Sequence, residues 1–264
     1  MRWSERQRAM LQAMGIRLFG PAAAPAQDGP PIAAPIAAPM PAPTVAARPA
    51  PPAAAIDAIT VAERSASRPD IASLDWPALR DMVAACRACA LCESRQQTVF
   101  GVGHVRAHWL IVGEAPGEQE DRQGEPFVGP AGQLLDNMLR ALNLTRDEAG
   151  PERQVYIANT LKCRPPKNRN PDPAETAQCA PFLERQIALV QPRIILAMGR
   201  FAAQALLASD EPLGKLRGRV HRYRGVPVVV TYHPAYLLRT LGDKARAWED
   251  LCLAAAVAEK TPDA

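Results

Sequence analysis

The sequence has no long hydrophobic run. No stretch approaches the roughly 18 consecutive apolar residues that a membrane-spanning helix needs, and the opening MRWSERQRAM is charged and lacks the apolar core of a signal peptide. We therefore expect a cytoplasmic protein with no membrane partner. The net charge is also small: a formal charge of +4 suits an anionic partner such as nucleic acid, but it is common among proteins that bind none.

Residues 20–69 hold little that a core could bury. Many of the 27 prolines fall between Pro21 and Pro52, in a run built almost entirely of Ala and Pro, so we expect a disordered, extended linker over residues 20–69. Ahead of it, residues 1–19 predict a short amphipathic helix, because apolar residues are spaced among basic ones. The apolar residues are Met10, Leu11, Met14 and Ile16. This helix can either dock a protein partner or fold back onto the rest of the chain, and the sequence favours neither.

Residues 70–264 predict one α/β domain. Short apolar runs rich in β-branched residues alternate with longer helical periods, which is typical of a mostly parallel sheet covered by helices. We expect a three-layer α/β/α architecture with a central four-stranded sheet, whose strands are residues 109–113, 155–161, 193–198 and 226–232. The expected helices are residues 131–142, 173–190, 200–207 and 244–258. Ligands in such sheets bind beyond the carboxyl ends of the strands, which directs attention to GEAPGEQED, to the chain after Asn159 and to HPAYLLR.

Six cysteines in a cytoplasmic chain argue against disulfides and for metal or redox chemistry. Cys86, Cys89 and Cys92 form a C-x2-C-x2-C motif, while Cys163 and Cys179 flank a run of fifteen residues. Four thiolates from these two regions can hold a tetrahedral zinc ion or a 4Fe-4S cluster, and spacing alone does not choose between them. Cys92 is either a spare thiol or one of the ligands.

Three longer segments are far more specific: GEAPGEQEDRQGEPFVGPAG, YIANTLKCRPPKNRNPDP and YHPAYLLR. They closely resemble the family 4 uracil-DNA glycosylases, which excise uracil from DNA, and the resemblance covers residues 86–253. It implies a 4Fe-4S cluster with Cys92 outside the ligand set, which is Cys86, Cys89, Cys163 and Cys179. We expect the cluster to be structural, because hydrolysis of a glycosidic bond requires no electron transfer.

The resemblance also implies a chemistry and the residues that perform it. The target nucleotide is flipped into a pocket, the bond between base and sugar breaks, and negative charge grows on the departing uracil. His233 resembles the catalytic histidine of the family, whose neutral imidazole donates to uracil O2. Glu114 is expected to orient or activate the attacking water, and Asn168 is a second candidate for positioning it.

Five residues are expected to form the base pocket. Phe127 resembles the family's stacking residue. Asn159 can donate to uracil O4 and accept from N3–H, a pattern that cytosine reverses at both atoms. Glu120 matches the position that lies against C5 of the base and would exclude the methyl group of thymine. Gly113 and Ala115 complete the predicted pocket.

The predicted partner is uracil-containing DNA, single- or double-stranded, bound by a monomer. Leu237 or Leu238 is expected to wedge into the gap left by the flipped base, with Arg239 near a phosphate. Arg217 and Arg219 belong to the segment LRGRVHRYRG, which predicts a basic hairpin that flanks the cleft and contacts phosphates.

Two other functions compete with this interpretation. A DNA-binding module with a structural metal site explains the cysteines and arginines, but not Phe127, Asn159 and His233 together. A covalently trapping relative requires an Arg-rich insertion ending in His after the second strand, and the run from Cys163 to Cys179 lacks it. Within the superfamily, Glu114 favours family 4 over family 5, whose members usually lack an acidic residue there.

Overall fold

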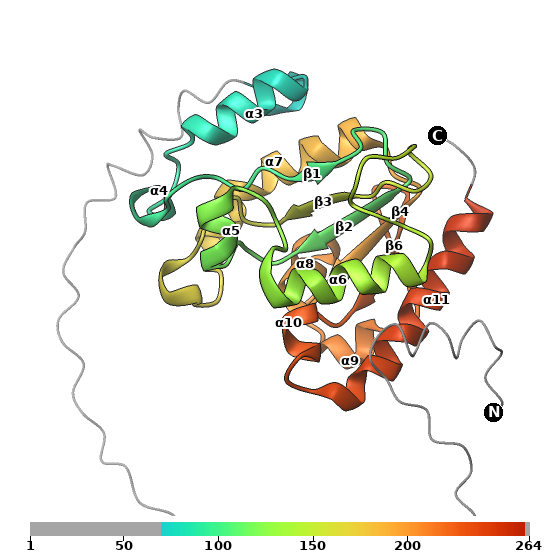
Figure 1. The fold of residues 1–264 in the computed structure, drawn as a ribbon. Helices are drawn as coiled ribbons and strands as arrows, with labels where there is room; N and C mark the ends of the chain where they lie inside the picture. The colour runs from blue at the N-terminus through green and yellow to red at the C-terminus, as the bar shows by residue number, and fades with distance from the viewer. Residues whose placement is uncertain (1–69, 262–264) are drawn as a thin grey trace, which may run out of the picture. The chain divides into compact units, whose positions relative to one another are not determined.

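A computed structural model describes residues 70–261 of the chain (Figure 1). The predicted amino-terminal helix at residues 1–19 and the Ala/Pro-rich linker at residues 20–69 lie outside the described residues. Among residues 70–261, no helix combines the length and the apolar character that crossing a membrane requires.

One six-stranded sheet, in the order β1-β3-β2-β4-β6-β5, forms the centre of the fold. Its four inner strands run parallel, and they are β3 (Tyr156–Asn159), β2 (Trp109–Gly113), β4 (Ile194–Met198) and β6 (Val226–Thr231). The edge strands pair antiparallel with their neighbours, and they are β1 (Val102–Gly103) and β5 (Val220–Tyr223). The four predicted strands are thus confirmed, but the sheet has two more.

The two edge strands lack the sequence pattern that identifies the inner ones. The inner strands are buried on both faces and therefore read as continuous apolar runs. In contrast, β1 is only two residues long, and the side chains of β5 alternate between exposed and half-buried. A short or half-exposed edge strand contributes too few apolar residues to be detected from a run, which explains why the expected strand number was too small.

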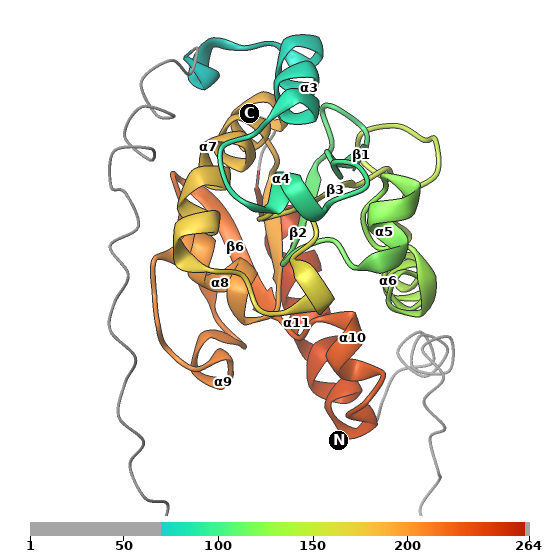
Figure 2. The same cartoon turned by 90° about the vertical axis from the view of Figure 1, so that its left-hand side faces the viewer.

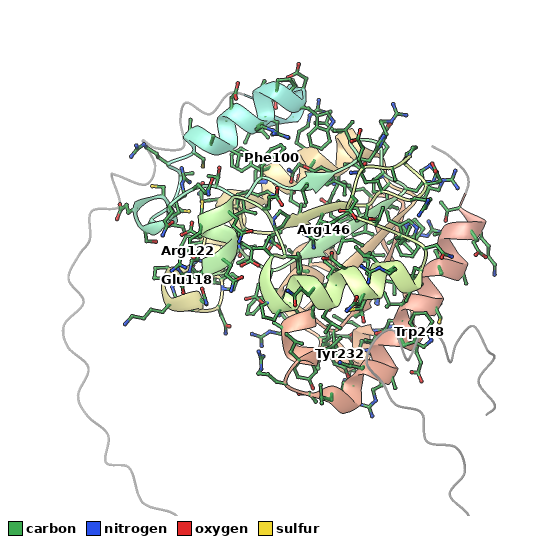
Figure 3. All side chains as sticks on the ribbon, viewed as in Figure 1. Phe100, Glu118, Arg122, Arg146, Tyr232 and Trp248 are labelled. Atoms are coloured by element: carbon green, nitrogen blue, oxygen red, sulfur yellow. The ribbon has the colours of Figure 1, made fainter. Side chains whose placement is uncertain are left out.

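Helices cover both faces of the sheet, as Figure 1 shows. One face packs against α6 (Gly129–Ala141) and α11 (Lys244–Lys260). Trp248 of α11, labelled in Figure 3, is buried in this core. The other face packs against α7 (Pro173–Val190) and α8 (Arg200–Leu207). Alternate strand residues divide between the faces, so the three-layer α/β/α prediction is confirmed. The four predicted helices agree with the observed ones to within two residues at each end.

The segment before the first strand packs against α7 and the loop after β3. It contains α3 (Trp76–Ala85), which lies beside α7 in Figures 1 and 2, and its apolar residues form a third core with Cys163, Cys179 and Phe182. The other short helices are η1 (Ile71–Ser73), α4 (Leu91–Ser94), α5 (Glu118–Gln123), η2 (Pro166–Asn168), α9 (Leu213–Leu216), α10 (Pro234–Leu237) and η3 (Leu241–Asp243).

Candidate active site

A cavity of about 180 Å³ opens at the carboxyl ends of the parallel strands. This volume is many times the roughly 10–15 Å³ that one water molecule needs. The cavity gathers residues from the loops after β2, β3 and β6. The predicted site residues that line it are Glu114, Ala115, Glu120, Phe127, Asn159, Asn168 and His233. The strand order explains the convergence, because parallel strands place their carboxyl ends at one edge of the sheet.

Asn159 lines this cavity and carries an unpaired acceptor. The residue ends β3 and is 2% exposed, and within the described part of the chain its Oδ1 has no hydrogen-bond partner. Leaving a buried acceptor unpaired costs about 1–3 kcal/mol. The arrangement therefore suits a ligand that brings a hydrogen-bond donor.

Gly113 is not among the residues that line the cavity, but it pairs in register with Asn159, which is. A Cβ at this position would lie 2.4 Å from Asn159 Oδ1 and 2.5 Å from the Cζ of Phe127. Only glycine therefore allows both side chains to occupy their places. The missing side chain of Gly113 thus leaves room for two residues that line the cavity.

His233 and Phe127 form one wall of the cavity. Their rings stack, with centroids 5.2 Å apart and planes at 27°. His233 Nδ1 accepts the N–H of Ala235 at 3.2 Å, so the ring proton lies on Nε2 in the neutral imidazole. Burial, assisted by Arg239, lowers the pKa of His233 to about 4. At neutral pH the residue is consequently an uncharged donor.

The two glutamates at the cavity have different surroundings. Both carboxylate oxygens of Glu120 accept hydrogen bonds from backbone N–H groups, those of Gly117 and Val128, each at 3.0 Å. The side chain is therefore held in place in the wall of the cavity. Glu114 directly follows β2. Burial raises its pKa above the ordinary 4.5, and Arg200 opposes that shift. A carboxylate with a raised pKa at the edge of a cavity can accept a proton from water.

Asn168 reaches the cavity on a strained loop. Lys167 and Asn168 adopt φ values of 55° and 53°, and Asn168 Oδ1 accepts from Arg164 Nε at 2.8 Å. With its oxygen engaged, the amide NH2 group is the part that can bind a water. Arg169 also lines the cavity and forms an ion pair with Glu175. It was not predicted as a site residue from the sequence, although it lies in the CRPPKNR motif.

The two leucines proposed for the DNA wedge differ in environment. Leu237 is fully buried in the core beneath α10, whereas Leu238 is 42% exposed. The packing of α10 against α6 turns one side chain inward and the next outward. Of the two candidates, only Leu238 is accessible to DNA, and the adjacent Arg239 is exposed as well.

The expected basic hairpin does not present all its arginines to the cleft. Arg217 forms an ion pair with the buried Asp250 at 2.7 Å, and its guanidinium lies 4.5 Å from the ring centroid of Tyr232. Arg219 is exposed and pairs with Glu211. The β5–β6 register places Arg222 and Arg224 around the hairpin turn, at the amino end of β6. The cavity lies at the carboxyl end of that strand, so these two arginines lie away from it. The expectation that the whole hairpin flanks the cleft is therefore corrected.

A second cavity is walled by five cysteines, Cys86, Cys89, Cys92, Cys163 and Cys179. Donors point at two of the sulfurs: Arg95 Nη1 lies 3.0 Å from Cys163 Sγ, and the N–H of Lys162 lies 3.3 Å from Cys179 Sγ. Burial raises the pKa of the Cys179 thiol to about 12, so only a bound cation would keep it ionised. Within residues 70–261, no three His, Cys, Asp or Glu side chains are arranged to hold a single metal ion.

Comparison with known proteins gives consistent matches. The family model described as "Uracil DNA glycosylase superfamily" matches residues 100–253. A type-4 uracil-DNA glycosylase of Archaeoglobus fulgidus is 41% identical over 164 residues, which cover 59% of this chain and 79% of the relative. One of Pyrobaculum aerophilum is 39% identical over 188 residues, or 68% and 93% of the two chains. A type-5 uracil-DNA glycosylase of that organism is 33% identical over 148 residues, or 51% and 64%.

Proposed function

Since the chain belongs to the type-4 uracil-DNA glycosylases of the uracil-DNA glycosylase superfamily, we propose that it excises uracil from DNA. It hydrolyses the N-glycosidic bond and leaves an abasic site for base excision repair. The observation that carries the proposal is a single cavity that combines an unpaired amide acceptor, a neutral histidine and an aromatic ring. The enzyme acts as a cytoplasmic monomer on single- or double-stranded DNA.

Asn159 selects the base. Its Oδ1 accepts from uracil N3–H and its NH2 group donates to O4, whereas cytosine presents an acceptor at N3 and a donor at C4. A pocket that leaves such groups unpaired rejects the wrong base by about 10⁴-fold or more. Glu120, fixed by two backbone N–H groups, fills the space beside C5 and excludes thymine.

His233 stabilises the leaving group. As the C1′–N1 bond breaks, its electron pair moves onto uracil, and Nε2–H donates to O2 where negative charge develops. One donor of this kind lowers the activation free energy by about 3–4 kcal/mol. Phe127 stacks on the base, and its ring also packs against the ring of His233.

Glu114 accepts the proton of the attacking water. The water oxygen forms the new bond to C1′, and its proton passes to the carboxylate, whose raised pKa suits this task. The amide of Asn168 helps to hold the water. Both residues line the cavity from opposite loops, one after β2 and one after β3.

Leu238 is the proposed wedge into the gap in the duplex, because it is the exposed member of the leucine pair. Arg239 and Arg219 contact phosphates. The guanidinium of Arg217 covers the ring of Tyr232. It thereby supports the surface that Leu238 and Arg239 present to DNA. The buried Leu237 anchors α10 beneath it.

The cysteine cavity holds a 4Fe-4S cluster through Cys86, Cys89, Cys163 and Cys179. These four are among the five cysteines that line the cavity, a donor set that suits a polynuclear cluster, and the donors aimed at Cys163 and Cys179 fit thiolate ligands. When bound, the cluster supplies a rigid link rather than a reacting group. Cys163 and Cys179 flank the loop that carries Asn168, so this link fixes one wall of the base pocket.

The test is excision from a defined oligonucleotide. The purified, iron-loaded protein is incubated with strands that differ only in one uracil, cytosine or thymine, and alkali then cleaves any abasic site. We expect cleavage at uracil alone, in wild type and not in Asn159→Leu. Absence of cleavage at uracil, or equal cleavage at cytosine, would overturn the proposed function.

A further inference from the structure

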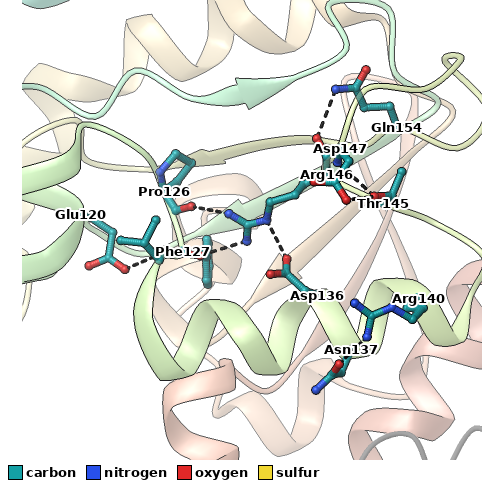
Figure 4. Close-up of polar contacts among 11 residues, drawn as sticks. Glu120, Pro126, Phe127, Asp136, Asn137, Arg140, Thr145, Arg146, Asp147 and Gln154 are labelled. Carbon is teal, nitrogen blue, oxygen red and sulfur yellow. Dashed lines mark hydrogen bonds and ion pairs between the residues drawn. The ribbon is translucent and has the colours of Figure 1, made fainter.

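Arg146 binds the backbone of Phe127, the proposed stacking residue, which lines the cavity (Figure 4). It lies in the loop after α6 and is 17% exposed. Its Nη2 donates to the carbonyl of Phe127 at 2.9 Å and its Nη1 to that of Pro126 at 3.2 Å. Nε pairs with Asp136 of α6 at 2.6 Å. One planar guanidinium therefore ties the Phe127 loop to a rigid helix.

Phe127 needs such support because its backbone is strained. Its φ is 54°, in the left-handed region that costs a non-glycine residue about 1–2 kcal/mol. Its carbonyl also approaches α6 so closely that a Cβ at Gly132 would lie 1.8 Å from the carbonyl oxygen. A strained conformation of this kind persists only when the surroundings determine it.

The same peptide bond is held from its other side. Its carbonyl belongs to Phe127 and accepts from Arg146, while its N–H belongs to Val128 and donates to Glu120 Oε1 at 3.0 Å. Both polar groups of one peptide plane are thus engaged by side chains from separate elements. Arg146 also holds the carbonyl of Pro126, so the peptides on both sides of the Phe127 Cα are engaged and its backbone angles are constrained. The Cα–Cβ bond that carries the ring is thereby directed, and the ring itself packs against that of His233.

We propose that Arg146 is a positioning residue for uracil: together with Glu120 it clamps the Phe127–Val128 peptide, so that the Phe127 ring is already in place to stack on the flipped base. Arg146 does not touch the base. The inference rests on the proposed function for its consequence in catalysis, but the clamp itself is independent of it. A ring held in advance avoids the ordering cost that binding would otherwise incur.

The experiment compares Arg146→Met with Arg185→Met. Arg185 of α7 is the matched control, because it does not line the cavity and also donates to a backbone carbonyl, that of Leu74, at 2.5 Å. In Arg146→Met we expect single-turnover excision to fall between about tenfold and a hundredfold, with weaker inhibition by free uracil and unchanged affinity for uracil-free DNA. Ethylguanidinium should partly restore Arg146→Ala, and Arg185→Met should keep the wild-type rate.

A second readout separates the clamp from the activity. With 4-fluorophenylalanine placed at position 127, the ¹⁹F resonance should shift or broaden in Arg146→Met and stay unchanged in Arg185→Met, whether or not the protein excises uracil. An inactive wild type would refute the proposed function alone. An unchanged resonance in Arg146→Met, or an excision rate equal to that of Arg185→Met, would overturn the positioning role. If Arg146→Met does not fold, Arg146→Lys, which keeps the charge but loses the fork, takes its place.

Discussion

The imidazole of His233 stacks on the ring of Phe127, with centroids 5.2 Å apart. The group proposed to stabilise the departing base and the group proposed to stack on it are therefore packed against each other. Gly113 makes room for Phe127 from below, and Nδ1 of His233 is oriented by the N–H of Ala235. The proposed donor and the proposed stacking surface are consequently preset together.

His233→Ala should lower the single-turnover excision rate by about a hundredfold or more, since one donor to a developing anion contributes roughly 3 kcal/mol. DNA affinity should change little, because the bond gains strength only in the transition state. Saturating enzyme and rapid quenching isolate the chemical step. A loss of affinity with an unchanged chemical rate would show that the histidine is a binding residue.

The excision rate should fall on the acid side with the titration of Glu114. Burial raises the pKa of Glu114 above 4.5, so the basic, deprotonated form is lost as the pH decreases through that raised value. His233, with a pKa of about 4, stays neutral over most of this range. A pH–rate profile between about pH 5 and 8 tests the assignment: Glu114→Gln should be slow and lack the acid limb. Persistence of the limb in this variant would assign it to another group.

Protein purified without oxygen should contain about four irons per chain if one 4Fe-4S cluster is bound. Cys163→Ala and Cys179→Ala should lose both iron and the visible absorption, whereas Cys92→Ala should keep them. Metal analysis with absorption spectra provides the measurement. Stoichiometric zinc with negligible iron contradicts the cluster, and loss of iron in Cys92→Ala would place Cys92 among the ligands.

Leu237→Ala and Leu238→Ala should fail in different ways. Leu237 is fully buried, so its truncation should cost about 2–5 kcal/mol of stability, seen in chemical unfolding. Leu238 is exposed, and its truncation should slow excision of paired uracil more than of single-stranded uracil, because only the duplex must be opened. Equal loss on both substrates in Leu238→Ala would remove its wedge role.

The inner sheet and the approximate place of the site could be predicted because their signals are local. Continuous apolar runs identify strands that are buried on both faces, and a motif that directly follows a parallel strand must lie at the carboxyl edge. Glu114 after β2 and His233 after β6 meet for this reason. The edge strand β5 has no comparable local signal, since its side chains are half exposed.

The sequence by itself determined the fold class, the order of the site motifs and the cysteine spacing, all of which depend on short stretches of chain. Only the tertiary structure decided which neighbour each side chain meets. Arg146 reads as an ordinary surface arginine until its contact with the Phe127 carbonyl is seen. Arg217 is likewise committed to Asp250, 33 residues away. Such pairs form because the packing of separate elements brings them together, and no local pattern encodes that distance.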